Sequence, residues 1–318
     1  MRNAGTKRPP GPEPLRIRSV LLPLDGSDFA EQAIPWATGI ARKARARLRL
    51  ALVHQSPEPP PSTQAERRLY TRIQLSLRKS QRSYLRTTAA RLRAEGPIRV
   101  GTAMLHGEPA SALGSYIRDV GLDLVVMTTH GRGGLERAWL GSVADLMVRT
   151  LEIPILLIRP SEGAAPPPGA ERILVPLDGS RRAEAVLPPA MAMARILEAE
   201  LTLLQAVQPV VAMASAAPAF ARSYGADLSE LRRTEAEGYL EGVAEQVSGA
   251  GITARADAVL ALGTVEAIRA ASRAPGVGMI ALATHGHGGL RRMVLGSVAD
   301  KLVRSVDLPV LVTRPRGR

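Results

Sequence analysis

A glycine-rich motif of sixteen residues occurs twice in the chain, first as Thr128-Thr-His-Gly-Arg-Gly-Gly-Leu-Glu-Arg-Ala-Trp-Leu-Gly-Ser-Val143 and again as Ala283-Thr-His-Gly-His-Gly-Gly-Leu-Arg-Arg-Met-Val-Leu-Gly-Ser-Val298. Because glycine has no side chain, such a loop can turn sharply and bring backbone N–H groups together around an anion. The Gly-Ser pair precedes a helical pattern, and the free N–H groups at a helix start favour phosphate. This spacing therefore suggests phosphate binding by backbone and hydroxyl groups.

A purely structural role is the competing interpretation. The segments Ser142-Val-Ala-Asp145 and Ser297-Val-Ala-Asp300 resemble helix capping boxes with Asp in place of Glu. A cap does not explain why His-Gly stands at a fixed distance upstream. The chain contains neither a P-loop lysine motif nor the dinucleotide pattern G-x-G-x-x-G. His130 and His285 have no partner evident in the sequence, so we expect them to make structural hydrogen bonds and predict no catalytic residue.

A second repeated element ends in an acidic turn. Val20-Leu-Leu-Pro-Leu-Asp-Gly-Ser27 returns as Ile173-Leu-Val-Pro-Leu-Asp-Gly-Ser180. The aspartates, Asp25 and Asp178, could accept hydrogen bonds from a ribose or help to hold a divalent cation beside phosphates. Both repeated elements recur at nearly the same offset, which indicates one domain duplicated in tandem.

Apolar strand patterns alternate with helical patterns in each copy. The first copy predicts strands at Ile17–Leu24, Leu48–Val53, Ile98–Leu105, Leu122–Thr128 and Ile153–Ile158. It predicts helices at Phe29–Ala46, Thr63–Ala94 (as one helix or two), Pro109–Val120 and Ser142–Leu151, with a loop at Pro57 to Ser62. Such alternation is typical of a parallel sheet covered by helices. We therefore predict an α/β fold of two duplicated domains, each an open five-stranded parallel sheet with helices on both faces.

The division of the chain follows from this repeat. We expect a basic, flexible N-terminus at 1–16, a first domain at 17–160, a proline-rich linker at 161–170 and a second domain at 171–318. In an open parallel sheet, ligands bind beyond the carboxyl ends of strands where the winding reverses. The acidic turn and the glycine-rich loop share one site only if the first and fourth strands are neighbours.

The motif residues resemble the universal stress protein family, here as a tandem member. The resemblance rests on the Pro-Leu-Asp-Gly-Ser opening and on the family spacing of a glycine, two residues, a second glycine, nine residues and Gly-Ser. The second glycine is Gly131 and the Gly-Ser pair is Gly141-Ser142, and the spacing is repeated in the second copy. It implies five parallel strands in the order 3-2-1-4-5, with ATP bound where strands one and four diverge. It also implies that Asp25 and Asp178 lie on the ribose and metal side, where Mg²⁺ would accompany ATP, and that Val53 and Ala206 lie beside the adenine.

The resemblance places the phosphates on the glycine-rich segments. The candidate nucleotide-binding residues of the first copy are Pro23, Leu24, Asp25, Val53, Met127, Thr128, His130, Gly131, Arg132, Gly141, Ser142 and Val143. Those of the second copy are Pro176, Leu177, Asp178, Ala206, Leu282, Ala283, His285, Gly286, His287, Gly296, Ser297 and Val298. The family's first motif glycine is replaced by Thr128 and Ala283, and family members without the glycine pattern do not bind ATP. Arg132 is always charged whereas His287 is mostly neutral at pH 7, so the first copy should hold a triphosphate better.

Bulk composition narrows the class of protein. The chain has no cysteine, which excludes disulfides and thiolate zinc sites and fits a reducing cytoplasm. Its start has no apolar core typical of a secretory signal, and no uninterrupted apolar run would span a membrane. The net charge of +13 is concentrated in residues 1–160, which hold 25 basic and 13 acidic residues. We interpret this excess as a solvated arginine-rich surface and expect no nucleic-acid partner, because no binding motif or interleaved aromatic residues accompany it.

The favoured function is a non-catalytic, ATP-binding stress-response or signalling protein of the cytoplasm. A weak ATPase and a dimerisation module without nucleotide remain open alternatives. Each copy ends in an apolar strand with a proline near its start, at Ile153–Ile158 and Leu308–Thr313. Proline is tolerated at a sheet edge and exposed apolar edges invite pairing, so we expect the two last strands to pack on each other. The family resemblance also implies a homodimer.

Overall fold

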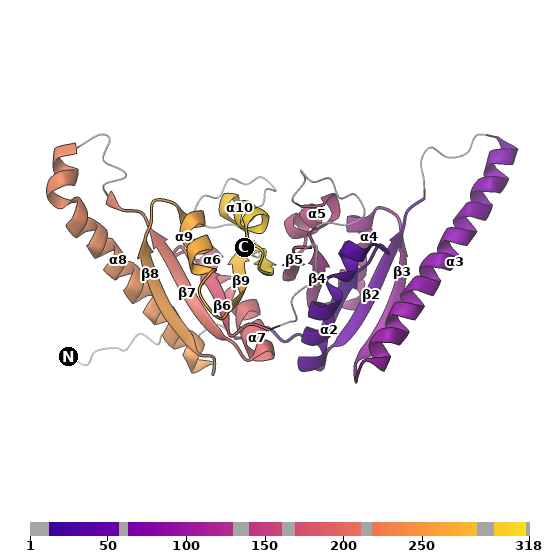
Figure 1. Cartoon of the computed structure of the whole chain (residues 1–318), viewed down its shortest axis with the longest axis horizontal. Helices are drawn as coiled ribbons and strands as arrows, with labels where there is room; N and C mark the ends of the chain where they lie inside the picture. Colours follow the sequence, from indigo (N-terminus) through magenta and orange to yellow (C-terminus); the bar gives the residue numbers. More distant parts are fainter. Residues whose placement is uncertain are drawn as a thin grey trace, which may run out of the picture.

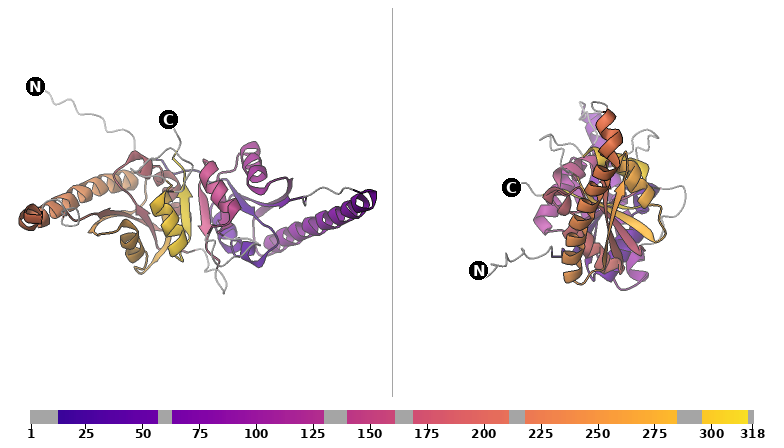
Figure 2. Two further views of the ribbon diagram at one scale, coloured as in Figure 1. Left: turned by 90° about the horizontal axis from the view of Figure 1, so that it is seen from above. Right: turned by 90° about the vertical axis from the view of Figure 1, so that its left-hand side faces the viewer.

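The computed structural model describes residues 13–56, 63–129, 140–160, 169–210, 218–284 and 296–315. The expected N-terminal arm and the linker fall largely outside these ranges. The described residues form two similar halves joined side by side, with the two longest helices at opposite ends of the molecule (Figures 1 and 2).

Each half alternates strands with helices, as the sequence patterns predicted. The first half consists of β1 (Ser19–Pro23), α1 (Asp28–Glu31), α2 (Ile34–Lys43), β2 (Arg47–His54), α3 (Gln64–Ala94), β3 (Arg99–His106), α4 (Pro109–Val120), β4 (Leu124–Thr128), α5 (Ser142–Thr150) and β5 (Ile155–Ile158). The second half consists of β6 (Arg172–Pro176), α6 (Arg181–Glu184), α7 (Leu187–Leu197), β7 (Glu200–Val207), α8 (Pro218–Gly249), β8 (Ala254–Leu260), α9 (Thr264–Ala271), β9 (Val277–Ala283), α10 (Ser297–Ser305) and β10 (Val310–Thr313).

The ten strands form a single sheet in the order β3-β2-β1-β4-β5-β10-β9-β6-β7-β8. Within each half all neighbouring strands run parallel. Their positions across the sheet confirm the expected order 3-2-1-4-5 in both halves. The two halves meet at β5 and β10, which pair antiparallel with Leu156 opposite Leu311. The final strands therefore pack on each other as their prolines and apolar residues predicted, and neither of them remains an open edge.

Helices cover both faces of the sheet. On one face, the side chains of Val20, Leu22, Leu48 and Leu50 pack with residues of α2 and α3. On the other face, Leu21, Val125 and Leu157 pack with residues of α4 and α5. The second half repeats the arrangement, and the core is built from aliphatic side chains, as the low aromatic content requires.

Two helix predictions needed the structure to decide them. The single helix expected at Phe29–Ala46 is wrong, because the chain forms α1 and α2 with a break at Gln32 and Ala33. Pro35 lacks an N–H group and lies in the first turn of α2, where proline favours a new helix start. Thr63–Ala94, by contrast, is one helix. Its start is fixed by a capping box in which the side chains of Thr63 and Glu66 each accept a backbone N–H of the other residue.

No helix in the described part of the chain combines the length and the apolar character needed to cross a membrane.

Candidate functional site

The site lies where the chain diverges from two neighbouring strands. β1 pairs with β4 as well as with β2, so the acidic turn and the end of β4 are adjacent, as the shared-site hypothesis required. After β1 the chain continues toward β2, since the N–H of Leu24 donates to the carbonyl of Ala51 at 2.8 Å. After β4 it continues toward β5, since the N–H of Thr129 donates to the carbonyl of Ile158 at 2.9 Å. This divergence is the switch point at which open parallel sheets bind ligands.

The acidic turn is fixed by its own side chains. Oδ1 of Asp25 accepts hydrogen bonds from the N–H of Ser27 at 2.9 Å and from its hydroxyl at 2.6 Å. The Ser27 hydroxyl in turn accepts the N–H of Ala30 and caps α1. Gly26 has φ +80°, a conformation that favours glycine. Asp178, Gly179 and Ser180 repeat the turn in the second half, so each aspartate is held at the switch in a set orientation.

The helix start after the glycine-rich loop is held beside this turn. The N–H of Gly141 donates to the carbonyl of Thr129 at 2.7 Å, which returns the chain to the end of β4. Gly296 makes the same bond to Thr284. Each of these bonds therefore places the start of a helix at the end of the strand that neighbours β1 or β6.

The capping-box interpretation of Ser142 and Ser297 is wrong. The N-cap residues are Gly141 and Gly296, neither helix has a side-chain cap, and each serine is the exposed first residue of its helix. Asp145 bonds to Arg149 in the next turn at 2.8 Å, and Asp300 does the same with Arg304. Glycine has no side chain, and no side chain caps either helix start. The backbone N–H groups of the first turn can therefore donate hydrogen bonds to an anion.

The apolar candidates surround the switch point. Leu24 and Met127 are buried, while Pro23, Val53 and Val143 are partly exposed. In the second half Leu177 and Leu282 are buried, while Pro176, Ala206, Ala283 and Val298 are partly exposed. His130, Gly131, Arg132, His285, Gly286 and His287 lie outside the described residues, so their place at the site stays a prediction.

The departure from the family pattern lies within regular strands. Thr128 ends β4 opposite Ile158, and Ala283 ends β9 opposite Thr313. Neither residue is among the described positions of positive φ. The backbone at these two positions therefore does not require glycine, and their side chains need not alter the path of the loop.

A tyrosine–glutamate bond that the sequence patterns did not suggest links the long helix to the acidic turn. The hydroxyl of Tyr84 in α3 donates to Glu31 of α1 at 2.8 Å, and Tyr239 in α8 donates to Glu184 of α6 at 2.9 Å. Burial, followed by this bond to a carboxylate, raises the pKa of each tyrosine. The nearly equal separation of the two residues, 53 positions in the first copy and 55 in the second, was the signal that could have revealed it.

A polar cluster beside Val53 was also missed. The ring nitrogens of buried His54 lie 2.8 Å from Oε1 of Gln81 and 2.5 Å from Oε1 of Gln74. The ring of His106 meets that of His54 edge-on at 5.7 Å. The second half has Val207 and Leu260 at the matching strand positions, so this cluster belongs to the first half alone.

Metal ligands do not gather among the described residues, where no three His, Cys, Asp or Glu side chains form a cluster suited to an ion. A divalent cation at the switch would therefore depend on the aspartate together with ligand phosphates, which is a common arrangement for Mg²⁺.

Comparison with known proteins agrees with the fold and its duplication. The profile of the universal stress protein family matches residues 16–159 and again 169–314. A universal stress protein of Mycobacterium tuberculosis (strain ATCC 25618 / H37Rv) is 26% identical over 300 residues, which cover 93% of this chain and 96% of that protein. A universal stress protein of Methanocaldococcus jannaschii is 28% identical over 143 residues, or 45% of this chain and 82% of its own.

A solved structure shows the same overall fold. The crystal structure of a universal stress protein from Archaeoglobus fulgidus DSM 4304 superposes with a TM-score of 0.64 and 17% identity, covering 93% of this chain and 96% of that one. Together with the two matches of the family profile, these similarities show that the chain belongs to the universal stress protein family.

Proposed function

We propose that the chain binds ATP at the strand switch of each half, and that it acts in the cytoplasm through nucleotide occupancy rather than catalysis. The observation that carries the proposal is the helix start at Gly141, which has no side-chain cap and is tied to the end of β4 beside the acidic turn. Backbone N–H groups and a serine hydroxyl at a helix start suit phosphate oxygens. The same elements recur at Gly296.

Each part of the nucleotide has a matching group. Gly141, Ser142 and Val143 would meet the phosphates, Asp25 would meet the ribose or a Mg²⁺ ion held with the phosphates, and Val53 would lie beside the base. Asp178, Ala206, Gly296, Ser297 and Val298 would do the same in the second half. ATP would supply charge and binding free energy at the switch, and the chain would bind and orient it.

The decisive experiment measures nucleotide on the protein. Mass spectrometry of small molecules released on denaturation should detect ATP or ADP, and calorimetry should detect ATP binding. Gly141→Asp should abolish binding in the first half, because it adds bulk and negative charge where a phosphate approaches the backbone. Gly238→Asp is the matched control, since Gly238 is exposed on α8 with nothing near its absent side chain. Equal ATP affinity in the wild type and a folded Gly141→Asp protein would refute the assignment.

The two alternative functions are separated by further measurements. A weak ATPase would release phosphate from ATP at a rate above background, and it needs a general base that no residue of the described site supplies in an evident way. A dimerisation module would release no nucleotide on denaturation and would show no calorimetric signal with ATP. We also propose that the whole chain forms a homodimer, which light scattering of the purified protein would test.

A further inference from the structure

Four arginines line a hollow at the end of the sheet opposite the strand switch. The hollow has a volume of about 450 Å³ and is lined by Arg47, Arg49, Arg93, Ile98, Arg99, Val100 and Gly101. Arg47 is the first residue of β2 and Arg99 the first of β3, whereas the candidate nucleotide residues lie at the carboxyl ends of the strands. The eight residues of β2 span about 25 Å at roughly 3.3 Å per residue, so the two places are separate.

Strand register brings the guanidinium groups together. Arg47 is paired with Arg99, and Arg49 is paired with Gly101, so all three arginines lie on one face of neighbouring strands. A side chain at Gly101 would begin 2.5 Å from Nη1 of Arg49, so the absence of one leaves the place that this guanidinium occupies. Arg93 reaches the same edge from α3 and donates to the carbonyl of Val100. The hollow therefore results from the register of β2 and β3, which gathers the arginines, and from the lack of a side chain at Gly101.

The positive charge in this hollow is not neutralised by any residue that the structure describes. Among the ion pairs between described residues, none involves any of these four arginines. Arg93 and Arg99 each donate to a backbone carbonyl, which positions the groups without offsetting their charge. Like charges directly opposite on paired strands destabilise a sheet, and an anion bound among them would remove that cost.

The second half shows what the same place looks like when it is neutral. Thr202 takes the position of Arg49, and Arg255 takes that of Gly101. Glu200 begins β7 as Arg47 begins β2, and it forms an ion pair with Arg255 at 3.0 Å. The duplicated backbone therefore accepts an internal ion pair here, whereas the first half has four arginines and a glycine instead.

We propose that this arginine hollow binds a compact ligand that carries two or more adjacent phosphate groups. Guanidinium groups form forked hydrogen bonds with phosphate oxygens and stay charged at all physiological pH values. Four guanidinium groups around one hollow match the charge of several adjacent phosphate groups better than the charge of one phosphate group. The volume is that of a small-molecule site rather than of an extended groove.

The test uses inorganic tripolyphosphate as the probe, measured by calorimetry on full-length protein that carries Gly141→Asp and Gly296→Asp. These changes are meant to exclude binding at the strand switches, and the arginine variants are compared in that same background. Arg49→Gln with Arg99→Gln should lower tripolyphosphate affinity at least tenfold. Arg47→Glu with Arg49→Thr and Gly101→Arg, which gives the first half the ion pair and the threonine of the second half, should abolish binding while the protein stays folded. Tripolyphosphate should also raise the melting temperature of the unaltered hollow and not that of these variants.

Matched controls separate a site from a general effect of charge. Arg72→Gln with Lys79→Gln removes two exposed charges from α3 away from the hollow and should leave affinity within twofold. Orthophosphate should bind at least tenfold more weakly than tripolyphosphate. Equal affinity in the ion-pair variant, or equal loss in the α3 control, would overturn the proposal. Binding of only a long oligonucleotide or of anionic vesicles, with none of tripolyphosphate, would also overturn it, because the partner would then be a macromolecule. The proposal of ATP binding at the switch is tested separately, on protein that keeps Gly141 and Gly296, so either proposal can fail without the other.

Discussion

The two halves of the molecule have the same backbone fold but carry different side chains on their outer strands and long helices. Both keep the acidic turn, the serine cap, the tyrosine–glutamate bond and the glycine–threonine bond that closes the loop. They differ at β2 and β3, where the first half has the His54 cluster and the arginine hollow, and the second half has apolar residues and an ion pair. The groups retained in both copies are those that position the strand switch. The difference separates the proposed nucleotide site, whose frame both halves share, from the proposed arginine hollow, which belongs to the first half.

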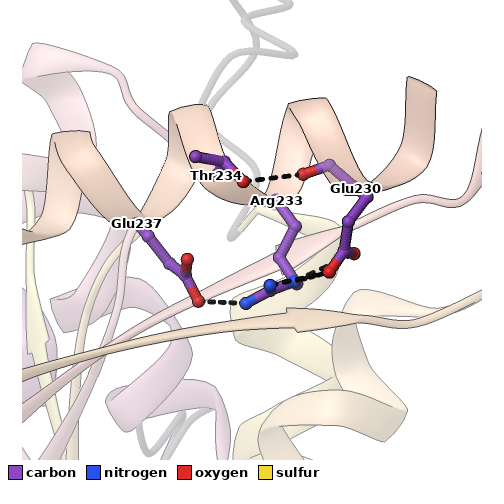
Figure 3. A network of polar contacts seen from close by, with 4 residues as sticks. All are labelled: Glu230, Arg233, Thr234 and Glu237. Carbon is purple, nitrogen blue, oxygen red and sulfur yellow. Dashed lines mark hydrogen bonds and ion pairs between the residues drawn. The ribbon is translucent and has the colours of Figure 1, made fainter. Parts of the chain in front are cut away.

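The long helices show the same divergence. α3 carries nine basic residues and one acidic residue, whereas α8 carries three basic and six acidic residues. On α8 the charges are paired within the helix: Arg233 lies between Glu230, at 2.7 Å, and Glu237 (Figure 3). The side chain of Glu31 is an ion-pair partner of Arg91 on α3. Helices in equivalent positions thus present opposite net charge at the two ends of the molecule (Figure 1).

The largest expected effect concerns the strands that join the halves. Ile155 and Val310 are each only 2% exposed. The double variant Ile155→Asp with Val310→Asp would bury two carboxylates and should lower the unfolding free energy by more than about 4 kcal/mol. Small-angle scattering should show the halves separating, and proteolysis should become faster in the linker, from Ala164 to Gly169. Wild-type compactness and wild-type protease resistance would contradict the strand pairing.

A gentler variant keeps this test interpretable if the charged protein does not fold. Leu156 and Leu311 are opposite each other and fully buried. A double-mutant cycle of their alanine variants should give a coupling of about 0.5–3 kcal/mol in unfolding free energy. Leu48 with Leu311 is the control pair, on strands that do not neighbour each other, and should be additive.

The second prediction compares the two nucleotide sites. Arg132→Ala should weaken ATP binding in the first half by about 1–3 kcal/mol, the scale of a charged hydrogen bond. His287→Ala should weaken the second half less, because a mostly neutral imidazole contributes less to a triphosphate. Calorimetry with the other site blocked by Gly296→Asp or Gly141→Asp measures each site separately. Equal losses of ATP affinity at the two sites would contradict the predicted asymmetry. No loss of affinity in Arg132→Ala would show that Arg132 is a solvated surface residue without a role in ATP binding.

The third prediction tests what the halves share. Tyr84→Phe and Tyr239→Phe each remove one hydrogen bond to a glutamate and should each lower the unfolding free energy by about 1 kcal/mol. The pKa of each tyrosine is raised in the folded state, so this contribution is present below the ordinary tyrosine pKa of about 10 and is lost at higher pH. Denaturation with urea between pH 7 and pH 11 checks both points. A large difference between the two variants would show that the duplicated bond has different roles.

The smallest expected effect is the acid sensitivity of the first half. Burial and the neighbouring charges of Arg78, His54 and Arg82 lower the pKa of His106 below 6.5. A histidine with a lowered folded-state pKa binds fewer protons than the unfolded chain, so stability is lost as the pH falls below about 6.5. His106→Leu, the residue of the second half, should therefore flatten the pH dependence of stability between pH 7 and pH 5. The mutant Leu260→Ile is the control and should keep the wild-type slope.

The sequence by itself determined the duplication, the order of elements and the residues of the acidic turn. These follow from local patterns: alternating apolar strands and helices, and a turn whose Asp, Gly and Ser bond within three residues. Tyr84 with Glu31 and the arginine hollow join residues of different elements, and only tertiary structure brings those together. The capping-box prediction failed for a related reason. Ser142 and Asp145 have the spacing of a cap, but the bond of Gly141 to Thr129 makes glycine the cap residue and leaves the serine one position inside the helix. Short-range spacing cannot reveal which residue a distant strand end will hold in place.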